Sequence, residues 1–404
     1  MKKTAFITAE YNPFHNGHLR QLDETKKAGA ERVVVLMSGN FVQRGECALF
    51  SKKSRAEAAV RAGADLVLEI PLKYAVSGTS HFAYGAMKTA LSTGLDGTVS
   101  FGAECDLQKL RTACVFLKDE SVKKHIRDLC RCKGYSFPRA REYVTVDTLG
   151  SDYLYTISKP NNILALQYMS EAADLNAPFD FFAVKRTGAE HDGTESFGEK
   201  NDIASALLIR KNLTKNKRDL TDISRFVPAF SFEIVRKDIA DGKYIDEQKY
   251  SLAVMSRLML LDKSSLFETN GISHGLENVF YEKIRSSLTI SELCSAVKSK
   301  RYTFSRLRQC CLSAALGIKR SDLDGDVPFV NVLGFNETGR KMLHEIHARS
   351  AVPFVGLLSQ AKKLCQTAAR DIEIMENAEY LYNLCLDVPD SNFSPYKFKP
   401  FVSE

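Results

Sequence analysis

The stretch Thr4-Ala5-Phe6-Ile7-Thr8-Ala9-Glu10-Tyr11-Asn12-Pro13-Phe14-His15-Asn16-Gly17-His18 decides the fold of this 404-residue chain. Its apolar part, residues 5–9, predicts a β-strand, and Asn12-Pro13-Phe14 predicts the turn that ends it. Leu19, Leu22 and Thr25 then begin a helical period. A strand that passes into a helix in this way leaves free backbone N–H groups at the helix N-terminus, where they are able to bind phosphate.

Two histidines lie on the first turn of that helix. His15 and His18 are three residues apart, so both imidazoles can face a phosphate chain, and Gly17 lets backbone approach a ligand closely. Attack on the α-phosphate of a nucleotide needs donors already in position, because charge builds on the departing pyrophosphate. We therefore predict an ATP-handling enzyme in which His15 and His18 are catalytic.

Alternation of apolar runs with amphipathic runs continues from this motif. Strands are predicted at 32–38, 64–71 and 97–102, with helices at 52–63 and 79–93 between them and a late strand at 179–186. This βαβ order predicts an α/β fold with a Rossmann-like parallel sheet. Ligands of such sheets bind at the carboxyl ends of the strands, and the polar loops of this chain follow those ends.

The pattern changes twice along the chain. Residues 106–150 read as a charged helical insertion, and after about residue 220 the sequence is mainly helical, for example at 247–261 and 276–299, with a short βα unit at 327–348. We predict an ATP-binding catalytic domain over 1–220 and a mainly helical domain over 221–404, which is expected to bind RNA.

Composition narrows the class of protein. The apolar run near the N-terminus is too short and too polar for a signal segment, and no apolar run approaches membrane length. These features predict a cytoplasmic protein with no membrane partner. Among ten cysteines, the close pairs Cys130/Cys132 and Cys310/Cys311 lack the spacing of a zinc or redox motif, so no metal site is assigned.

Positive charge is concentrated in places although the net charge is only +7. Residues 210–218 hold five cations, and Lys298, Lys300, Arg301, Arg306 and Arg308 are interleaved with Tyr302 and Phe304. Cations with aromatics suit RNA backbones and unstacked bases. Within the first cluster we assign RNA binding to Lys211, Lys215, Lys217 and Arg218.

Two further segments are candidates for the site. Ser205, at a predicted helix start, and Arg210, five residues later, form a second phosphate-binding pair. Ser38, Asn40, Gln43 and Arg44 follow the second strand and are assigned to substrate. Since a reactive intermediate formed at such a site must be protected from water, the 37–46 loop is also expected to close over the site.

The pairing of H-x-G-H at 15–18 with Ser205-Ala206-Leu207-Leu208-Ile209-Arg210 resembles the two signatures of the nucleotidyltransferase superfamily. The segments 9–18 and 37–46 are similar to those of one branch of it, the bacterial tRNA(Met) cytidine acetate ligases. The resemblance to this branch runs along nearly the whole chain. The resemblance implies that acetate attacks the α-phosphate of ATP, giving acetyl-adenylate and pyrophosphate. The N4 amine of the wobble cytidine of elongator tRNA(Met) then takes the acetyl group, and AMP leaves.

The resemblance also implies where ATP binds, together with Mg²⁺ held mainly by phosphate oxygens. The choice between Asn161 and Asn162 stays open, as do the oligomeric state and any protein ligand of the metal. The expected ATP-binding residues, of which Ser205 and Arg210 rest on the second signature, are Ile7, Thr8, Ala9, Glu10, Tyr11, Asn12, Pro13, Phe14, His15, Asn16, Gly17, His18, Leu19, Arg20, Gly102, Asn161 or Asn162, Arg186, Ser205 and Arg210.

Two other functions were weighed against the ligase. A nucleotidyltransferase acting on a small phosphorylated metabolite shares the histidine motif, but the helical C-terminal part is oversized for a small acceptor. A noncatalytic RNA-binding protein with a degenerate nucleotide fold has no physical reason to keep His15, Gly17, His18 and Arg186 together. Exchange of pyrophosphate into ATP separates the three functions. It requires acetate in the ligase, it requires a phosphorylated metabolite in the transferase, and it does not occur in the noncatalytic binder.

Overall fold

The central element of the structure is an eight-stranded sheet. The structure is a computed structural model, and it describes residues 1–186, 202–215, 220–273, 275–364 and 368–403. The strand order of the sheet is β10-β8-β5-β2-β1-β6-β7, with β9 beside β8, and the five strands from β5 to β7 in this order are all parallel. The predicted parallel α/β sheet is thereby confirmed. The strands are β1 (Thr4–Ala9), β2 (Arg32–Ser38), β5 (Leu66–Ile70), β6 (Thr98–Ala103), β7 (Asp180–Lys185), β8 (Val330–Phe335), β9 (Phe354–Val355) and β10 (Phe401–Val402).

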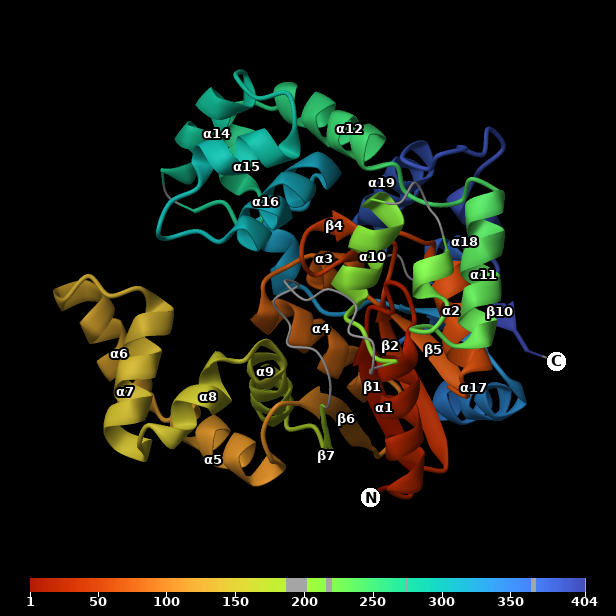
Figure 1. Ribbon diagram of the computed structural model, residues 1–404, viewed down its shortest axis with the longest axis horizontal. Coiled ribbons are helices and arrows are strands. Elements are labelled where there is room, and N and C mark those ends of the chain that lie inside the picture. The colour runs from red at the N-terminus through yellow and green to blue at the C-terminus, as the bar shows by residue number, and fades with distance from the viewer. Residues whose placement is uncertain (187–201, 216–219, 274, 365–367, 404) are drawn as a thin grey trace.

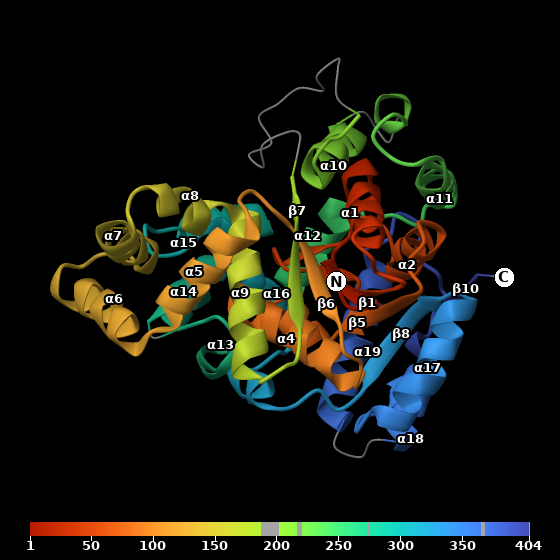
Figure 2. The same ribbon diagram turned by 90° about the horizontal axis from the view of Figure 1, so that it is seen from below.

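Helices cover both faces of this sheet (Figures 1 and 2). Successive side chains of a strand point to opposite faces, so Ile7 and Val35 pack with α1 and α2, whereas Phe6 and Val34 pack with α4, α9 and α17. The helices of these two layers are α1 (Asn16–Lys27), α2 (Lys52–Arg61), α4 (Thr79–Ser92), α9 (Pro160–Asp174) and α17 (Glu337–Arg349).

Three C-terminal strands belong to the same sheet. β8 pairs antiparallel with β5, with Leu66 opposite Phe335, and β9 and β10 pair with β8. The apolar residues of β8 are buried and cover an edge that β5 would otherwise expose. The boundary near residue 220 stays a prediction, but the sheet itself extends beyond it.

The 106–150 region is helical, as expected (Figures 1 and 2). Leu110 and Ala113 of its first helix join the core beneath the sheet, whereas its other two helices stand away from the sheet in both views. Ile126, Leu129, Ala140 and Val144 give it a small core of its own. This insertion and the short helix that leads from it to α9 comprise α5 (Leu107–Lys118), α6 (Glu120–Cys132), α7 (Phe137–Leu149) and α8 (Asp152–Ser158).

The C-terminal helices form a second large core beside the sheet. The predicted helix over 276–299 is two helices, because Thr289 caps a new one by accepting the backbone N–H of Glu292 at 3.1 Å. The remaining helices are α3 (Leu72–Ala75), α10 (Ala206–Lys215), α11 (Ala229–Ala240), α12 (Glu247–Met259), α13 (Lys263–Glu268), α14 (Leu276–Ile284), α15 (Ile290–Val297), α16 (Phe304–Leu316), α18 (Leu358–Leu364) and α19 (Ala369–Leu384). Among the helices of the described ranges, none combines the length and apolar character needed to cross a bilayer.

Candidate active site

A cleft of about 600 Å³, open to solvent, lies at the carboxyl ends of β6 and β7 beside the N-terminus of α1. Three segments far apart in the sequence meet there. Seven of the predicted ATP-binding residues line it, so the structure brings the two sequence signatures together. The lining residues are His15, Gly17, His18, Arg20, Gln21, Gly102, Val184, Lys185, Arg186, Ile203, Ala204 and Ser205.

The two histidines form a fixed pair at the start of α1. His15 is the N-cap residue, and its Nδ1 accepts the backbone N–H of Gly17 at 3.0 Å. His18 Nδ1 accepts the backbone N–H of His15 at 3.2 Å, and the two rings stack with centroids 3.6 Å apart. Because each Nδ1 is an acceptor, each neutral ring carries its proton on Nε2. The pair therefore has two Nε2–H donors for a ligand.

Burial keeps these rings neutral. It lowers the pKa of His15 to about 3, with further contributions from the charges of Arg186 and Arg210. Burial also holds the pKa of His18 well below its usual value, helped by His15 and then by Arg186. At neutral pH the histidines thus donate hydrogen bonds without carrying charge, and the positive charge of the cleft comes from Arg20, Lys185 and Arg186.

The two glycines of the cleft differ in how closely they are packed. A Cβ on Gly17 would lie 2.9 Å from Cε1 of His15, so a side chain there would displace the imidazole. Gly102 pairs with Val184 across β6 and β7, and Arg186 continues from β7 by donating its N–H to the Ala103 carbonyl at 3.0 Å. A Cβ on Gly102 would contact the Arg186 side chain at 3.4 Å. The end of β6 therefore supports Arg186.

Aromatic residues of the predicted ATP segment lie behind the histidines. Tyr11 and Phe14 are buried, and their rings contact that of His18 with centroid separations of 4.8 and 5.6 Å. They support the imidazole and do not line the cleft. The other predicted residues of this segment are also absent from the cleft lining; they are Ile7, Thr8, Ala9, Glu10, Asn12, Pro13, Asn16 and Leu19.

Asn12, Asn16 and Arg210 connect this loop to the chain around α10. Arg210 donates from Nη1 to the Asn12 carbonyl at 2.7 Å, and burial lowers its pKa. The side-chain amide of Asn16 donates to the carbonyls of Asp202 and Arg225, both at 2.8 Å. Ser205 begins α10, where its Oγ accepts the N–H of Leu208 at 3.2 Å. Arg210 accordingly positions the loop between β1 and α1 that carries His15.

The two neighbouring asparagines bind Glu104 at the end of β6 and lie outside the cleft lining. Asn162 is fully buried, with Oδ1 accepting the Glu104 N–H at 2.9 Å and its own N–H donating to Glu104 Oε2 at 3.0 Å. The half-buried Asn161 donates its amide to Glu104 Oε1. Of the two, Asn161 is the more accessible to a ligand above β6.

The predicted substrate loop is a hairpin, β3 (Phe41–Val42) and β4 (Glu46–Cys47), packed on the C-terminal helices. Ser38 and Asn40 are buried, and the Asn40 amide donates to Glu379 at 3.1 Å. Gln43 is half-buried and Arg44 is exposed. The structure therefore does not bring Ser38 and Asn40 to the cleft, and the contacts of the hairpin do not support its predicted role as a closing loop.

Gly45, at the turn of this hairpin, lies against α16. It has φ +73°, and a Cβ on it would lie 2.4 Å from the Gln309 nitrogen. The Tyr250 hydroxyl donates to the Gly45 carbonyl at 3.2 Å, and Arg308 forms an ion pair with Glu46. The hairpin is thus joined closely to the helical part of the molecule.

The predicted RNA-binding cluster is only partly described. Lys211 is exposed on α10. The backbone of Lys215 ends that helix, whereas its side chain, together with Lys217 and Arg218, lies outside the described residues.

Two residues that bear on the site were missed by the sequence analysis. Gln21 lines the cleft and lies three residues after His18 on the same helix face. This spacing could have predicted it, because residues three apart on a helix are neighbours. Arg55 is buried and donates to the carbonyls of Glu10 at 2.6 Å and of Ser38 at 3.1 Å, which holds the ends of β1 and β2 together. Its partners come from separate segments, so sequence spacing could not reveal it.

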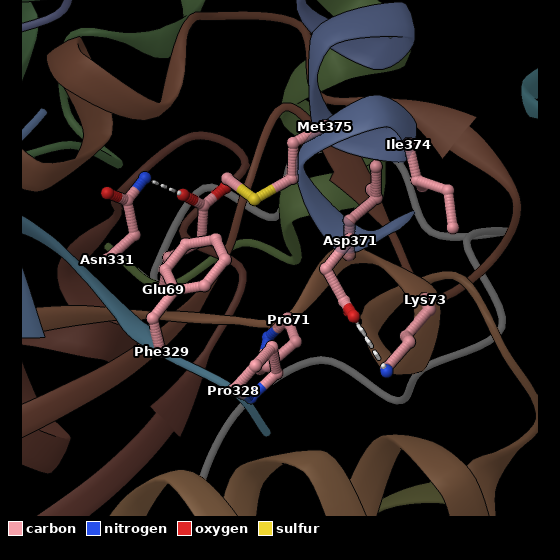
Figure 3. A pocket seen from close by; sticks show the side chains of 10 residues that line it. Glu69, Pro71, Lys73, Pro328, Phe329, Asn331, Asp371, Ile374 and Met375 are labelled. Atoms are coloured by element: carbon pink, nitrogen blue, oxygen red, sulfur yellow. Dashed lines mark hydrogen bonds and ion pairs between the residues drawn. The ribbon is translucent and has the colours of Figure 1, made fainter. Parts of the chain in front are cut away.

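A second cavity, of about 380 Å³, lies where α19 meets β5 and β8 (Figure 3). Lys73 pairs there with Asp371 at 2.9 Å, and the Asn331 amide donates to Glu69 at 2.7 Å. Glu69 also binds the buried Lys52 at 3.0 Å, and Lys52 reaches Glu379 of α19 at 2.9 Å. These contacts place the cavity at a junction between the sheet and the C-terminal helices.

A parallel sheet with H-x-G-H at the first helix N-terminus defines a nucleotidyltransferase, and the profile of the HIGH Nucleotidyl Transferase family matches residues 1–394. Within that class, the chain belongs to the tRNA(Met) cytidine acetate ligase family. The relative from Thermoanaerobacter sp. (strain X514) is 34% identical over 88% of this chain and 89% of its own length. That from Caldicellulosiruptor saccharolyticus is 33% identical over 99% and 95%.

Solved structures agree with this assignment. Thermotoga maritima TmcAL bound with alpha-thio ATP superposes with a TM-score of 0.90 at 28% identity, covering 99% of both chains. The apo form of the same protein gives a TM-score of 0.91 over the same coverage. The resemblance noted in the sequence is confirmed by these comparisons, as is the nucleotidyltransferase fold.

Proposed function

We propose that this protein activates acetate with ATP and acetylates N4 of the wobble cytidine of elongator tRNA(Met). An acetate oxygen attacks the α-phosphorus, the bond to the β-phosphate oxygen breaks, and acetyl-adenylate and pyrophosphate form. The N4 amine then attacks the acetyl carbonyl carbon, the bond to the AMP oxygen breaks, and the amine loses a proton. Adenylation of acetate and acyl transfer together consume one ATP for each acetylcytidine.

The observation that carries this proposal is the stacked neutral pair of His15 and His18 beside Arg186. Their Nε2–H groups are fixed by the hydrogen bonds at Nδ1, so little reorganisation is needed when charge develops on the pyrophosphate. Arg186 supplies permanent positive charge, because a guanidinium stays protonated. Lys185 adjoins it and shares the same role toward phosphate oxygens.

Mg²⁺ is expected to accompany ATP. Among the described residues, no group of three His, Cys, Asp or Glu is placed to hold a metal ion, and the Glu104 carboxylate is already bound by Asn161 and Asn162. These donors do not make a resident metal site. A metal that enters with ATP would be bound chiefly through phosphate oxygens, and it would add charge neutralisation there.

The tRNA is proposed to contact the basic surface around α10 and α16. Lys211 is exposed, and the start of α16 combines cations with rings: Lys298 lies 5.7 Å from the centroid of Phe304 and Arg306 lies 5.3 Å from that of Tyr302. Such pairs suit phosphates with unstacked bases. A tRNA substrate also implies that the protein acts in the cytoplasm.

Exchange of labelled pyrophosphate into ATP tests the proposal. Wild-type protein, His18→Ala and His344→Ala are compared with and without acetate, and acetylcytidine is assayed after adding bulk tRNA. His344 is an exposed histidine of α17 and serves as the matched control. We expect acetate-dependent exchange that falls at least ~100-fold in His18→Ala and is retained in His344→Ala. Exchange that requires a phosphorylated metabolite instead of acetate would overturn the proposal.

A further inference from the structure

The helical insertion, taken together with α8 and Lys159, carries most of the net positive charge of the chain. Residues 107–159, from α5 to the turn before α9, contain eleven lysines and arginines against six aspartates and glutamates, a net +5 of the chain's +7. The insertion's helices α6 and α7 stand away from the sheet in both views (Figures 1 and 2). Because a polyanion gains affinity from each phosphate that a cation neutralises, this charge favours a nucleic-acid partner.

Aromatic rings are exposed on the same segment and lie under its cations. Phe137, Tyr143 and Tyr155 are 59%, 46% and 48% exposed. Lys133 lies 5.9 Å from the centroid of Tyr143, and Arg139 lies 4.3 Å from that of Tyr135. Stacking platforms beside cations bind unpaired bases and the adjoining phosphates together. We call the residues Lys133, Tyr135, Phe137, Arg139 and Tyr143 the insertion face.

The insertion is connected to the active site through α8. Lys159 lies 5.1 Å from the Tyr155 ring centroid at the start of α9, and the Asn162 amide donates to the Tyr155 carbonyl at 3.5 Å. Asn162 in turn binds Glu104, two residues beyond Gly102 of the cleft. These contacts fix α8, and the insertion that precedes it, to the end of β6 that carries Gly102 of the cleft.

We propose that the insertion face binds the tRNA whose target cytidine enters the cleft. This inference rests on the proposed function and adds a second contact, separate from the cations of α10 and α16. Its rings receive unpaired bases and its cations receive the neighbouring phosphates. Charge and exposed aromatic area, rather than a preformed pocket, provide the affinity, so binding depends strongly on salt.

The test is the double variant Lys133→Glu/Arg139→Glu. Both residues are exposed, and Arg340→Glu/Lys341→Glu on α17 is the matched control because it makes the same change in net charge at two other exposed positions. Dissociation constants of bulk tRNA are measured by filter binding over a range of salt, with acetate-dependent pyrophosphate exchange measured in parallel. Preserved exchange shows that each variant is folded.

We expect the insertion variant to bind tRNA at least ~10-fold more weakly than the control variant, with a salt dependence reduced by about one to two in log–log slope. Equal binding by the two variants would overturn the inference. So would light scattering in which the wild type is a dimer and the insertion variant a monomer, since the face would then contact a second copy. If the wild type binds tRNA but forms no acetylcytidine, the proposed function is wrong. The comparison of the two variants in tRNA binding then still tests this inference.

Discussion

The imidazoles of His15 and His18 stack face to face at 3.6 Å, within 19° of parallel, and a backbone N–H of one residue donates to the ring of the other. His15 is buried and His18 is half-buried. Rings in this arrangement resist protonation, because a proton on Nδ1 of either would replace a hydrogen bond by a repulsive contact. Their neutrality is thus built into the first turn of α1.

Acid should destabilise the protein through His15. Its pKa is lowered to about 3 in the folded state, against about 6.5 when unfolded, so the unfolded chain binds the proton first as pH falls. The contribution of neutral His15 to the free energy of unfolding is complete above pH 6.5 and is lost toward pH 3. Roughly 2 kcal/mol of it is lost by pH 5. His15→Asn keeps an N-cap acceptor but no titratable ring.

Denaturant unfolding at pH 7.5, 6 and 5 measures this effect. The free energy of unfolding of His15→Asn should fall less steeply than that of the wild type, by about the same 2 kcal/mol over this interval. Equal slopes for the two proteins would show that His15 titrates normally in the folded state.

Arg186 is predicted to act on both ATP affinity and the histidine pKa values. Its charge lowers the pKa of His15 and of His18, so Arg186→Gln should raise both, as measured by NMR titration of the two imidazoles. The KM for ATP should rise by about tenfold, since a charge-assisted phosphate contact is lost. Arg340→Gln on α17 is the control, and unshifted imidazole titrations in Arg186→Gln would refute the coupling.

Lys52 should be among the most sensitive positions of the interior. It is buried between Glu69 and Glu379, and these carboxylates raise its pKa despite the opposing effect of burial. Lys52→Met leaves both carboxylates without their cation and is expected to cost about 3–5 kcal/mol. The exposed neighbour Lys53 gives the control Lys53→Met, expected within about 0.5 kcal/mol of wild type. Urea unfolding of both variants checks the difference, and equal losses would contradict it.

Gly45 should tolerate alanine less well than another glycine of positive φ. Gly45→Ala meets the backbone of α16, whereas Gly29, at φ +104°, has no atom within 4 Å of an added Cβ. Both variants pay about 1–2 kcal/mol for the left-handed backbone, and Gly45→Ala should lose about 1–3 kcal/mol more through overlap. Thermal unfolding of the two alanine variants would separate these effects, and matching midpoints would argue against close packing at Gly45.

Local patterns predicted the parallel sheet well. β1, β2, β5, β6 and β7 all lie where short apolar runs end in polar loops, and the strong helical periods after them are helices. Such signals are contained in adjacent residues, so no distant contact is needed to read them. For the same reason, His15, His18 and Gly17 could be assigned from one short motif, and Gly102 and Arg186 were added through the family resemblance.

The parts that escaped prediction depend on contacts between distant segments. Ser38 and Asn40 look like loop residues in the sequence, but Glu379, more than three hundred residues away, binds the Asn40 amide in the interior. Arg55 supports the ends of two strands through carbonyl groups, which carry no sequence signature. Likewise, the helical period across 276–299 hid the break at Thr289, where a side-chain cap starts a new helix.

The pairing of β8 with β5 bears on how the protein is made. A ribosome must deliver the chain past residue 335 before β5 receives this neighbour, although the strands that carry the histidine motif emerge far earlier. Until then the nascent nucleotide-binding half presents an open apolar edge, the kind of edge that recruits other chains. Expression of a fragment ending near residue 220 would make that exposure permanent.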